Sequence, residues 1–263
     1  MEAKGQRLDT LMVERGLADT RSRAQGLILA GAVRVGDQVV TRAGSRILPN
    51  QPLSVMQGNP FVSRAGEKLD AALDDFGIEV AGRPCLDAGA STGGFTDVLL
   101  KRGAERVLSV DVGYGQLDWS LRQEPRVAVL ERTNVRHLKG DDHPFGPDLL
   151  VADLSFISLG VALRTLLSTT PSLKEAVVLV KPQFEAGPEL VGRGGVVGDP
   201  GVRAGVILHV VETFAALGFG AVDLAPAAVT GRKSGNQEYP LRLLEGAPVR
   251  LDEGRIREVV AGA

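Results

Sequence analysis

The chain of 263 residues is predicted to fold as an α/β protein with a mostly parallel sheet, preceded by a small α+β module. One basis is the alternation, from residue 63 onward, of short apolar strands with amphipathic helices. A second is the stretch from Arg83 to Gly103, which has the pattern of a strand, a glycine turn and a helix. The third is charge. Residues 1–60 hold eight basic and five acidic residues and so have a net charge of +3. Because the whole chain has a net charge of −2, residues 61–263 have a net charge of −5. A basic module therefore precedes a larger acidic domain.

The composition excludes several classes of protein. With 44% hydrophobic and 24% charged residues, the sequence is typical of a folded globular protein. The apolar runs, such as 154–163 and 213–222, are too short to span a bilayer, and residues 1–19 lack a signal-peptide pattern. A single cysteine excludes an internal disulfide framework and a cysteine-based zinc site. We therefore expect a cytoplasmic protein without a membrane span.

The N-terminal module is predicted to contain two helices and short strands. Leu8, Leu11 and Met12 share one helical face, and Gly16 ends that helix. Thr20 is predicted to cap a second helix that stops at Gly31. Valines at 33, 35, 39 and 40 then indicate strands around a Gly36-Asp37 turn. The basic residues on these elements suggest polyanion binding, although solvated surface charges give the same pattern.

The second domain is predicted to begin with a helix capped by Ser63 and ended by Gly77, with Lys68 beside its apolar stripe. The Arg83 to Gly103 unit follows. Further along come a strand at 107–111, a short helix at 117–121, and strands at 127–130 and 149–153. Two of these strands end in acids, at Asp111 and Asp153.

The rest of the chain continues the alternation. A helix begins near Leu159 and must end before Pro171, and a strand at 176–180 ends at Lys181. A glycine-rich loop spans 185–199, and Asp199-Pro200 is predicted to open another helix. Strands are expected at 219–229 and 238–244, separated by a polar loop at 230–237.

The glycine turn suits a nucleotide-like ligand. Glycines at 89, 93 and 94 let the backbone approach a ligand closely, and the helix start offers unpaired N–H groups. Asp111, at the end of the next strand, is placed to accept hydrogen bonds from ribose hydroxyls. The dinucleotide pattern G-x-G-x-x-G is absent, because position 91 is Ser. A tight turn in any α/β protein remains the alternative at this point.

Candidates for chemistry gather at one edge of the predicted sheet. Ligands of such sheets bind outside the carboxyl ends of the strands, which puts Gly89, Asp111, Asp153 and Lys181 along one rim. Lys68 and Glu238 are further candidates, although any one of these lysines or acids alone is more often a surface charge. His137 and His143 lack the spacing of metal ligands, so no metal is predicted.

The first part of the chain resembles a known RNA-binding module. The run R-L-D-T-L-M-V-E-R-G-L-A-D-T-R-S-R-A-Q-G-L-I-L-A-G-A-V-R-V-G-D is similar to the S4 domain, a helix pair with a small sheet that grips structured RNA. The resemblance covers roughly residues 6–53 and departs at Gly36-Asp37, where Asn-Gly is usual. The RNA-binding residues that it implies are Arg7, Arg21, Arg23, Arg34, Arg42 and Arg46.

Nearly the whole chain resembles the TlyA-type family, bacterial proteins labelled haemolysins that are ribosomal RNA 2′-O-methyltransferases. The motifs that match are S-R-A-G-E-K-L, L-D-A-G-A-S-T-G-G-F-T-D, V-A-D-L-S-F-I-S-L, V-K-P-Q-F-E and G-N-Q-E. The family implies an S4-like domain at 1–58, a linker at 59–62 and an FtsJ-like methyltransferase domain at 63–263. That domain is expected to have the Rossmann-like class I fold, with seven strands of which the last is antiparallel.

The same resemblance implies a site. The Lys-Asp-Lys-Glu tetrad of FtsJ-like enzymes falls on Lys68, Asp153, Lys181 and Glu238. The residues implied to bind the methyl donor S-adenosylmethionine are Asp87, Gly89, Ala90, Ser91, Thr92, Gly93, Gly94, Phe95, Asp111, Asn134 and Asp153. The implied partner is ribosomal RNA or assembled ribosomal subunits. The oligomeric state stays open, with a monomer as the working assumption.

The tetrad suits this chemistry, because a ribose hydroxyl is a poor nucleophile that must be positioned and relieved of its proton. Among the rival functions, an NAD(P)-dependent oxidoreductase is disfavoured by the missing dinucleotide pattern. A membrane-active haemolysin is disfavoured by the lack of a long apolar span. A non-catalytic RNA-binding protein is the third alternative, and the presence of all four tetrad residues argues against it.

Overall fold

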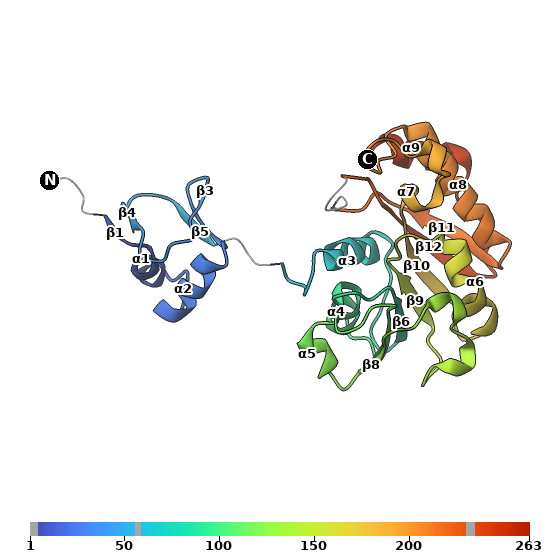
Figure 1. Ribbon diagram of the computed structural model, residues 1–263, viewed down its shortest axis with the longest axis horizontal. Helices are drawn as coiled ribbons and strands as arrows, with labels where there is room; N and C mark the ends of the chain where they lie inside the picture. The colour runs from blue at the N-terminus through green and yellow to red at the C-terminus, as the bar shows by residue number, and fades with distance from the viewer. Residues whose placement is uncertain (1–4, 56–58, 230–234) are drawn as a thin grey trace. The chain divides into compact units, whose positions relative to one another are not determined.

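The computed structural model describes residues 5–55, 59–229 and 235–263 (Figure 1). The chain forms two compact units that divide between Pro60 and Phe61, inside the predicted linker. Parts of two predicted segments, the end of the S4-like domain at 56–58 and the polar loop at 230–234, lie outside the described residues.

The first unit packs two helices against short strands. Thr20 caps the second helix as predicted, because its side chain accepts a hydrogen bond from the Arg23 N–H. Buried Leu8, Met12 and Ile28 form the centre of its core. Over residues 5–55 the elements are β1 (Gln6–Arg7), α1 (Leu8–Glu14), α2 (Arg21–Leu29), β2 (Val33–Val35), β3 (Gln38–Val39), β4 (Arg46–Ile47) and β5 (Leu53–Val55). Their strands pair as β3-β2-β5 and as β1-β4.

The second unit is built on one large sheet. Within its described residues the sheet has seven strands in the order β11-β12-β10-β9-β6-β7-β8. Their bounds are β6 (Pro84–Ala88), β7 (Arg106–Val110), β8 (Val127–Leu130), β9 (Leu149–Ala152), β10 (Glu175–Val180), β11 (Phe219–Leu224) and β12 (Tyr239–Glu245). Strands β6 to β10 pair in parallel, and β12 pairs antiparallel with both β10 and β11. The predicted seven-strand fold with an antiparallel last strand is confirmed.

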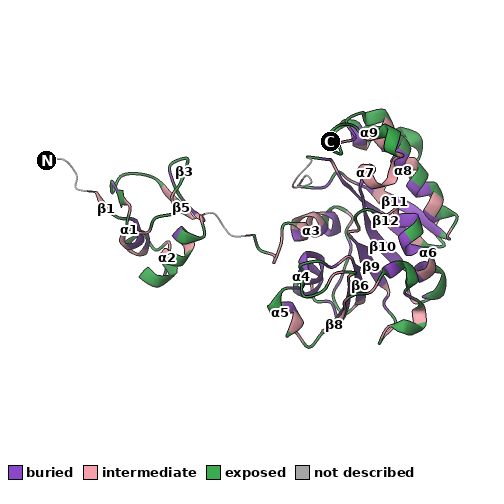
Figure 2. Cartoon of the chain, in the orientation of Figure 1, coloured by how far each residue is buried: buried purple, intermediate pink, exposed green. Residues whose placement is uncertain are grey.

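Helices cover both faces of the sheet, and its strands are buried between them (Figure 2). Side chains alternate between the faces, so Cys85 and Leu86 enter different cores. One face packs against α3 (Ala65–Asp75), α4 (Gly94–Lys101) and α5 (Trp119–Arg122). The other packs against α6 (Leu159–Thr169), α8 (Pro200–Ala215) and α9 (Glu253–Ala261). The shorter elements are α7 (Pro182–Glu185), η1 (Val135–His137), η2 (Gly140–Asp142) and η3 (Pro188–Leu190).

Several predicted boundaries differ from the structure. Strand β11 ends at Leu224 rather than at residue 229, because the chain then reaches Pro226, which cannot donate a ladder hydrogen bond. Helix α3 begins after Arg64 and has no side-chain cap, so Ser63 is not its N-cap. Helix α5 covers 119–122 rather than 117–121, because Asp118 accepts from the Ser120 N–H and sets its start. Helix α9, capped by Asp252, was not predicted.

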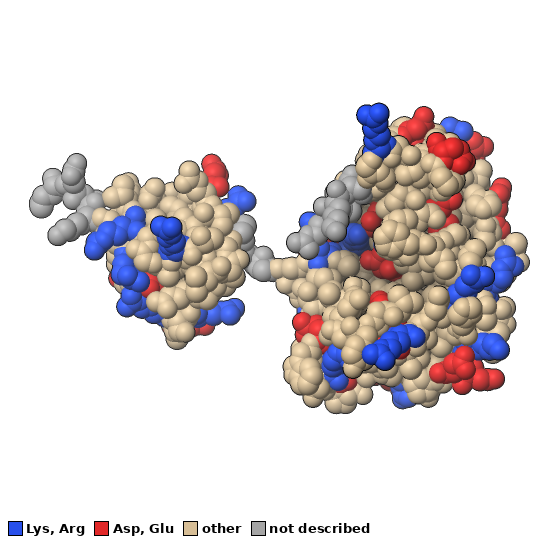
Figure 3. Space-filling view, in the orientation of Figure 1, with Lys and Arg blue, Asp and Glu red and all other residues tan. Residues whose placement is uncertain are grey.

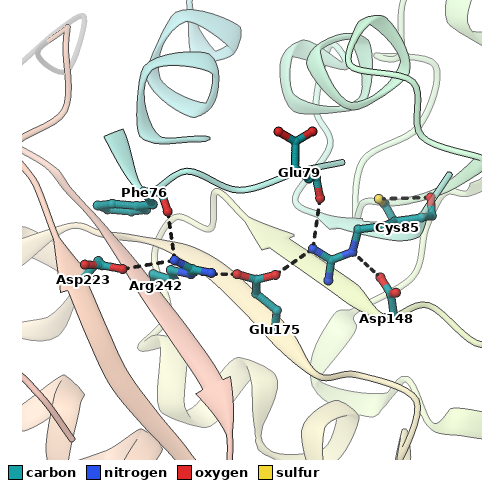
Figure 4. Close-up of polar contacts among 8 residues, drawn as sticks. Phe76, Glu79, Cys85, Asp148, Glu175, Asp223 and Arg242 are labelled. Carbon is teal, nitrogen blue, oxygen red and sulfur yellow. Dashed lines mark hydrogen bonds and ion pairs between the residues drawn. The ribbon is translucent and has the colours of Figure 1, made fainter. Parts of the chain in front are cut away.

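A chain of ion pairs crosses the edge of the sheet where the parallel strands begin (Figure 4). Glu175, the first residue of β10, accepts hydrogen bonds from Arg83 at 2.6 Å and from Arg242 at 2.7 Å. Arg83 also donates to Asp148 at 2.8 Å, and Arg242 donates to the Phe76 carbonyl at 2.9 Å. These contacts join β6, β10 and β12 and attach the end of α3 to the sheet.

Candidate active site

The turn after β6 is a position where only glycine fits. Gly89 has φ +88°, and a Cβ there would lie 2.6 Å from the Asp153 carbonyl oxygen. The N–H groups of Gly89 and Ala90 both donate to the Val110 carbonyl, at 2.9 and 3.1 Å. The turn is thereby tied to the end of β7 and pressed against the end of β9.

A cavity of about 620 Å³ opens beside this turn, and a smaller one of about 180 Å³ lies next to it. Gly89, Ser91, Asp153 and Ser155 line both cavities. The volume of the larger cavity falls within the range of small-molecule sites, roughly 300–1,000 Å³. Its place at the carboxyl ends of β6, β7 and β9 is where the fold predicts a ligand.

Most of the residues predicted to hold the methyl donor line these cavities. They are Gly89, Ala90, Ser91, Thr92, Gly94, Phe95, Asp111, Asn134 and Asp153. Gly93 lines neither of the two cavities found among the described residues, and its predicted contact with the donor stays a prediction. Its φ is +95°, and a Cβ there would meet the side chains of Leu117 and Leu121. Gly93 is thus required by packing against α5.

Asp87 is the second predicted donor residue that lies outside the cavities. It is fully buried beneath the glycine turn and lines neither cavity of the described region. One oxygen accepts from the Thr96 hydroxyl at 2.7 Å, whereas Oδ1 has no hydrogen-bond partner among the described residues. Burial raises the pKa of Asp87 to about 7. A buried acceptor without a partner below a ligand-sized cavity fits a site that receives a cationic or hydrogen-donating ligand.

Asp111 and Asn134 are oriented by backbone hydrogen bonds. The Asp111 carboxylate accepts from the Ser91 N–H at 2.7 Å and from the Gly113 N–H at 2.6 Å. Asn134 accepts from the Arg136 N–H at 3.0 Å, so its amide oxygen is engaged and its NH₂ group is left to donate. Both side chains border the larger cavity.

Lys181 and Asp153 meet at the smaller cavity. The Lys181 ammonium lies 2.5 Å from Asp153 Oδ1 and donates to the Ser155 hydroxyl at 3.0 Å. Each residue directly follows a strand, β10 for Lys181 and β9 for Asp153. Because these strands are parallel neighbours, their ends bring the two charges together although 28 positions separate them.

The other two tetrad residues form a second buried pair. Lys68 on α3 donates to Glu238 at 2.5 Å, and their side chains are 11% and 6% exposed. The antiparallel register pairs Val180 with Tyr239, so the next positions along, Lys181 and Glu238, lie across from each other. The two pairs are therefore neighbours, although no hydrogen bond joins them in the described residues.

Helix α3, which carries Lys68, is held to its surroundings along its length. Near its end, the Phe76 carbonyl accepts from Arg242 on β12. In its middle, Asp70 and Asp74 both pair with Arg102, just after α4. These contacts fix the helix that presents Lys68 to the strand end where Glu238 lies.

Two site residues were missed by the sequence reasoning. Ser155 hydrogen-bonds Lys181, and it lies inside the D-L-S-F-I-S motif that was used only for its aspartate. Phe156 is 90% exposed with φ +65°, an uncommon backbone conformation for a bulky residue. No sequence pattern predicts a positive φ at phenylalanine. The position of Phe156 between two serines, just after a strand, could nevertheless have marked it as a candidate site residue.

The six arginines predicted to bind RNA differ in their contacts. Arg7 and Arg21 both pair with Asp9, whose carboxylate is fully buried, and the hydrogen bond from Arg7 is the main cause of its strongly lowered pKa. Arg46 donates to the Gly5 carbonyl. Among the described residues, no hydrogen bond or ion pair involves the side chains of the exposed Arg23, Arg34 and Arg42. Figure 3 shows Lys and Arg side chains on the visible face of this unit.

The described residues offer neither a metal site nor a membrane-spanning helix. They contain no group of three or more His, Cys, Asp or Glu residues placed to hold a metal ion. None of the helices formed by these same residues is both long and apolar enough to cross a membrane.

Comparison with known proteins identifies the family. The model of the FtsJ-like methyltransferase family matches residues 61–243, and that of the S4 domain matches residues 6–53. The chain belongs to the FtsJ-like methyltransferase family. The matched stretch includes both lysine pairs, the glycine turn and the cavities, so the site described above lies in the methyltransferase domain.

Individual relatives narrow the family to its TlyA-type members. The 16S/23S rRNA (cytidine-2'-O)-methyltransferase TlyA of Mycobacterium tuberculosis is 48% identical over 92% of this chain and 90% of its own. Hemolysin A of Brachyspira hyodysenteriae is 39% identical over 89% of this chain and 97% of its own. A solved structure, "Putative hemolysin from Streptococcus thermophilus", is 36% identical with a TM-score of 0.75 and covers 99% of this chain and 96% of that one.

Proposed function

We propose that this protein transfers a methyl group from S-adenosylmethionine to the 2′-hydroxyl of a ribose in ribosomal RNA. The observation that carries the proposal is the Lys181–Asp153 pair, held at 2.5 Å against the cavity that the glycine turn lines. Lys181 lines the smaller cavity, which adjoins the donor-sized one, and a lysine nitrogen placed there suits removal of a proton from a hydroxyl during methyl transfer. Relatives such as the Mycobacterium tuberculosis enzyme, a 16S/23S rRNA (cytidine-2'-O)-methyltransferase, support ribosomal RNA as the substrate.

The donor site is assigned to the larger cavity. S-adenosylmethionine, when bound, supplies an electrophilic methyl group on a sulfonium. The Gly89 turn would lie against the donor, and Asp111 would accept hydrogen bonds from its ribose. Asn134 would donate from its amide to the adenine. The unpartnered oxygen of Asp87, which lines neither cavity, would accept a hydrogen bond from an ordered water.

Lys181 is assigned to the proton of the ribose hydroxyl. Its Nζ would take up this proton as the hydroxyl oxygen bonds to the methyl carbon and the bond from that carbon to the sulfonium sulfur breaks. Asp153 and Ser155 orient its nitrogen, because both lie within hydrogen-bond or ion-pair distance of Nζ. Lys68, held by Glu238, is assigned to positioning the hydroxyl from the neighbouring strand end.

The first unit is assigned to RNA binding. It carries the S4-domain match and a net charge of +3, and its exposed arginines suit phosphate contacts. Ribosomal RNA, alone or within assembled subunits, is the proposed partner, and we expect the protein to act in the cytoplasm. We expect binding that weakens steeply as salt rises, since phosphate contacts release counterions.

The test is a map of 2′-O-methyl groups on ribosomal RNA from cells with and without the protein. We expect at least one ribose, on a cytidine if the relatives' names are a guide, to be modified only when the protein is present. Identical maps, from a protein shown by calorimetry to bind S-adenosylmethionine, would contradict ribosomal RNA as the substrate. Dye release from lipid vesicles by the pure protein in that case would favour the membrane-active alternative.

A further inference from the structure

The segment that follows β10 contacts the loop that follows β9 at three successive places. We call these the 181–185 segment and the 153–158 loop. The first contact is the one already described, from Lys181 to Asp153 and Ser155. It fixes the beginning of the loop, where the Asp153 N–H also donates to the Ala88 carbonyl at 3.1 Å.

The second contact joins two aromatic rings. Phe184 and Phe156 lie with ring centroids 4.9 Å apart and planes tilted by 46°. Phe156 is the exposed residue with positive φ in the middle of the loop. A bulky residue in this conformation is strained, so its surroundings must hold it there.

The third contact is made by Glu185 at the far end of the loop. Its Oε1 accepts the Leu159 N–H at 2.8 Å. Leu159 is the first residue of α6, and Ser158, at the N-cap position, makes no side-chain capping bond among the described residues. Glu185 therefore satisfies, from another element, one of the first N–H groups of α6, which have no acceptor within the helix. It is partly buried, and its burial raises its pKa despite the Leu159 and Ser158 hydrogen bonds and the nearby His209.

We propose that Glu185 is a positioning residue for methyl transfer, which acts by closing the far end of the 153–158 loop. It lines neither of the cavities described above, so it is not a catalytic residue. The beginning of the loop is secured by the sheet and by Gly89, whereas its end is secured by Glu185. The exposed half between them carries Ser155 and Phe156 at the edge of the cavity, where the substrate must arrive. This inference rests on the proposed function.

The experiment compares Glu185→Ala with Glu185→Gln in the full chain. Alanine removes the acceptor for the Leu159 N–H, whereas glutamine keeps an amide oxygen in its place. We expect Glu185→Ala to lower the single-turnover methylation rate on ribosomal subunits by roughly ten- to a hundredfold, the scale of a displacement near 1 Å. Affinity for S-adenosylmethionine should fall less than the rate, because Asp153, at the beginning of the loop, stays tied to Ala88 although residues further along the loop also line the donor cavity. Glutamine should restore the rate.

Amide hydrogen exchange at Leu159 gives a readout that is independent of activity. It should be faster in Glu185→Ala than in the wild type and in Glu185→Gln. Glu189→Ala, at an exposed glutamate four residues further on, is the matched control and should change neither exchange nor rate. Leu166→Ala, in the buried face of α6, reports the effect of lost stability alone.

The possible failures are distinguishable. Unchanged Leu159 exchange in Glu185→Ala, or equal losses of donor affinity and rate, would overturn the positioning role. A rate that glutamine fails to restore would overturn it as well. A wild-type protein without activity on ribosomal RNA would contradict the proposed function instead, while the exchange and donor-affinity results would still decide whether Glu185 holds the loop.

Discussion

The two ends of the parallel strands in the central sheet carry similar charged residues in different surroundings. At the edge where the parallel strands begin, Glu175 bridges Arg83 and Arg242, and every one of these groups has a protein partner (Figure 4). At the opposite rim, Lys181 and Asp153 border a cavity, and Asp87 keeps an oxygen without a partner among the described residues.

The difference separates structural charges from functional ones. Charges that satisfy one another hold strands and helices together, and their removal should act on stability. Charges that face a cavity remain available to a ligand, and their removal should act on turnover. The predictions below test this distinction, beginning with the largest expected effect.

Lys181→Met should abolish most turnover and leave the fold intact. Methionine keeps much of the bulk of the side chain but cannot accept a proton. The single-turnover rate should fall about a hundred- to ten-thousandfold, while calorimetry shows donor binding retained. Lys174→Met is the matched control, because Lys174 precedes β10 at the other edge of the sheet and pairs with Glu245. A near-normal rate in Lys181→Met would remove Lys181 from the mechanism.

Glu175→Ala should show the opposite behaviour. It leaves Arg83 and Arg242 without their shared partner in a largely buried setting. We expect the free energy of unfolding, measured by urea denaturation, to fall by about 3 kcal/mol, with the methylation rate of the folded protein unchanged. Glu253→Ala, which breaks an exposed pair with Arg257 on α9, should cost less than about 0.5 kcal/mol. Equal losses in the two variants would mean that the buried chain is not structural.

Asp87→Asn should change how stability depends on pH. The folded protein holds the pKa of Asp87 at about 7, above the unfolded value of about 3.9, so between these values the folded state binds the extra proton. Asp87 therefore stabilises the fold at low pH, and this contribution is lost as pH rises through about 7. The free energy of unfolding of the wild type, relative to Asp87→Asn, should rise by roughly 1–3 kcal/mol from pH 8 to pH 5. A constant difference between the two proteins would show that Asp87 does not titrate in this range.

The contrast between structural and functional charges also applies within the first unit, where we expect the smallest effect of a substitution. The Arg23 side chain is exposed and has no partner among the described residues, whereas Arg7 pairs with buried Asp9. Arg23→Ala should weaken RNA binding and reduce the slope of log affinity against log salt by about 1. Arg7→Ala should in addition lower the melting temperature of this unit. Identical melting curves for the two variants would show that the pair with Asp9 is not structural.

Local patterns determined much of the fold. The glycine turn at 89, the Thr20 and Asp199 caps and the alternating strands and helices are set by neighbouring residues, and each is present. The predicted helices and strands were wrong where local sequence patterns are weak. Helix α9 was missed although Asp252 caps it, and β11 was predicted too long because apolar residues continue past Leu224.

The sequence by itself determined which residue types stand at the strand ends, because a strand, a turn and the next residue are consecutive in the chain. Only the tertiary structure decided their partners. Lys68 meets Glu238 across 170 positions, through the packing of α3 and the antiparallel register of β12. In the same way, long-range packing places Gly93 against the side chain of Leu121, where a Cβ would clash, and it buries Asp87 completely. Contacts between segments depend on how helices and strands stack, and no local pattern in the chain contains that information.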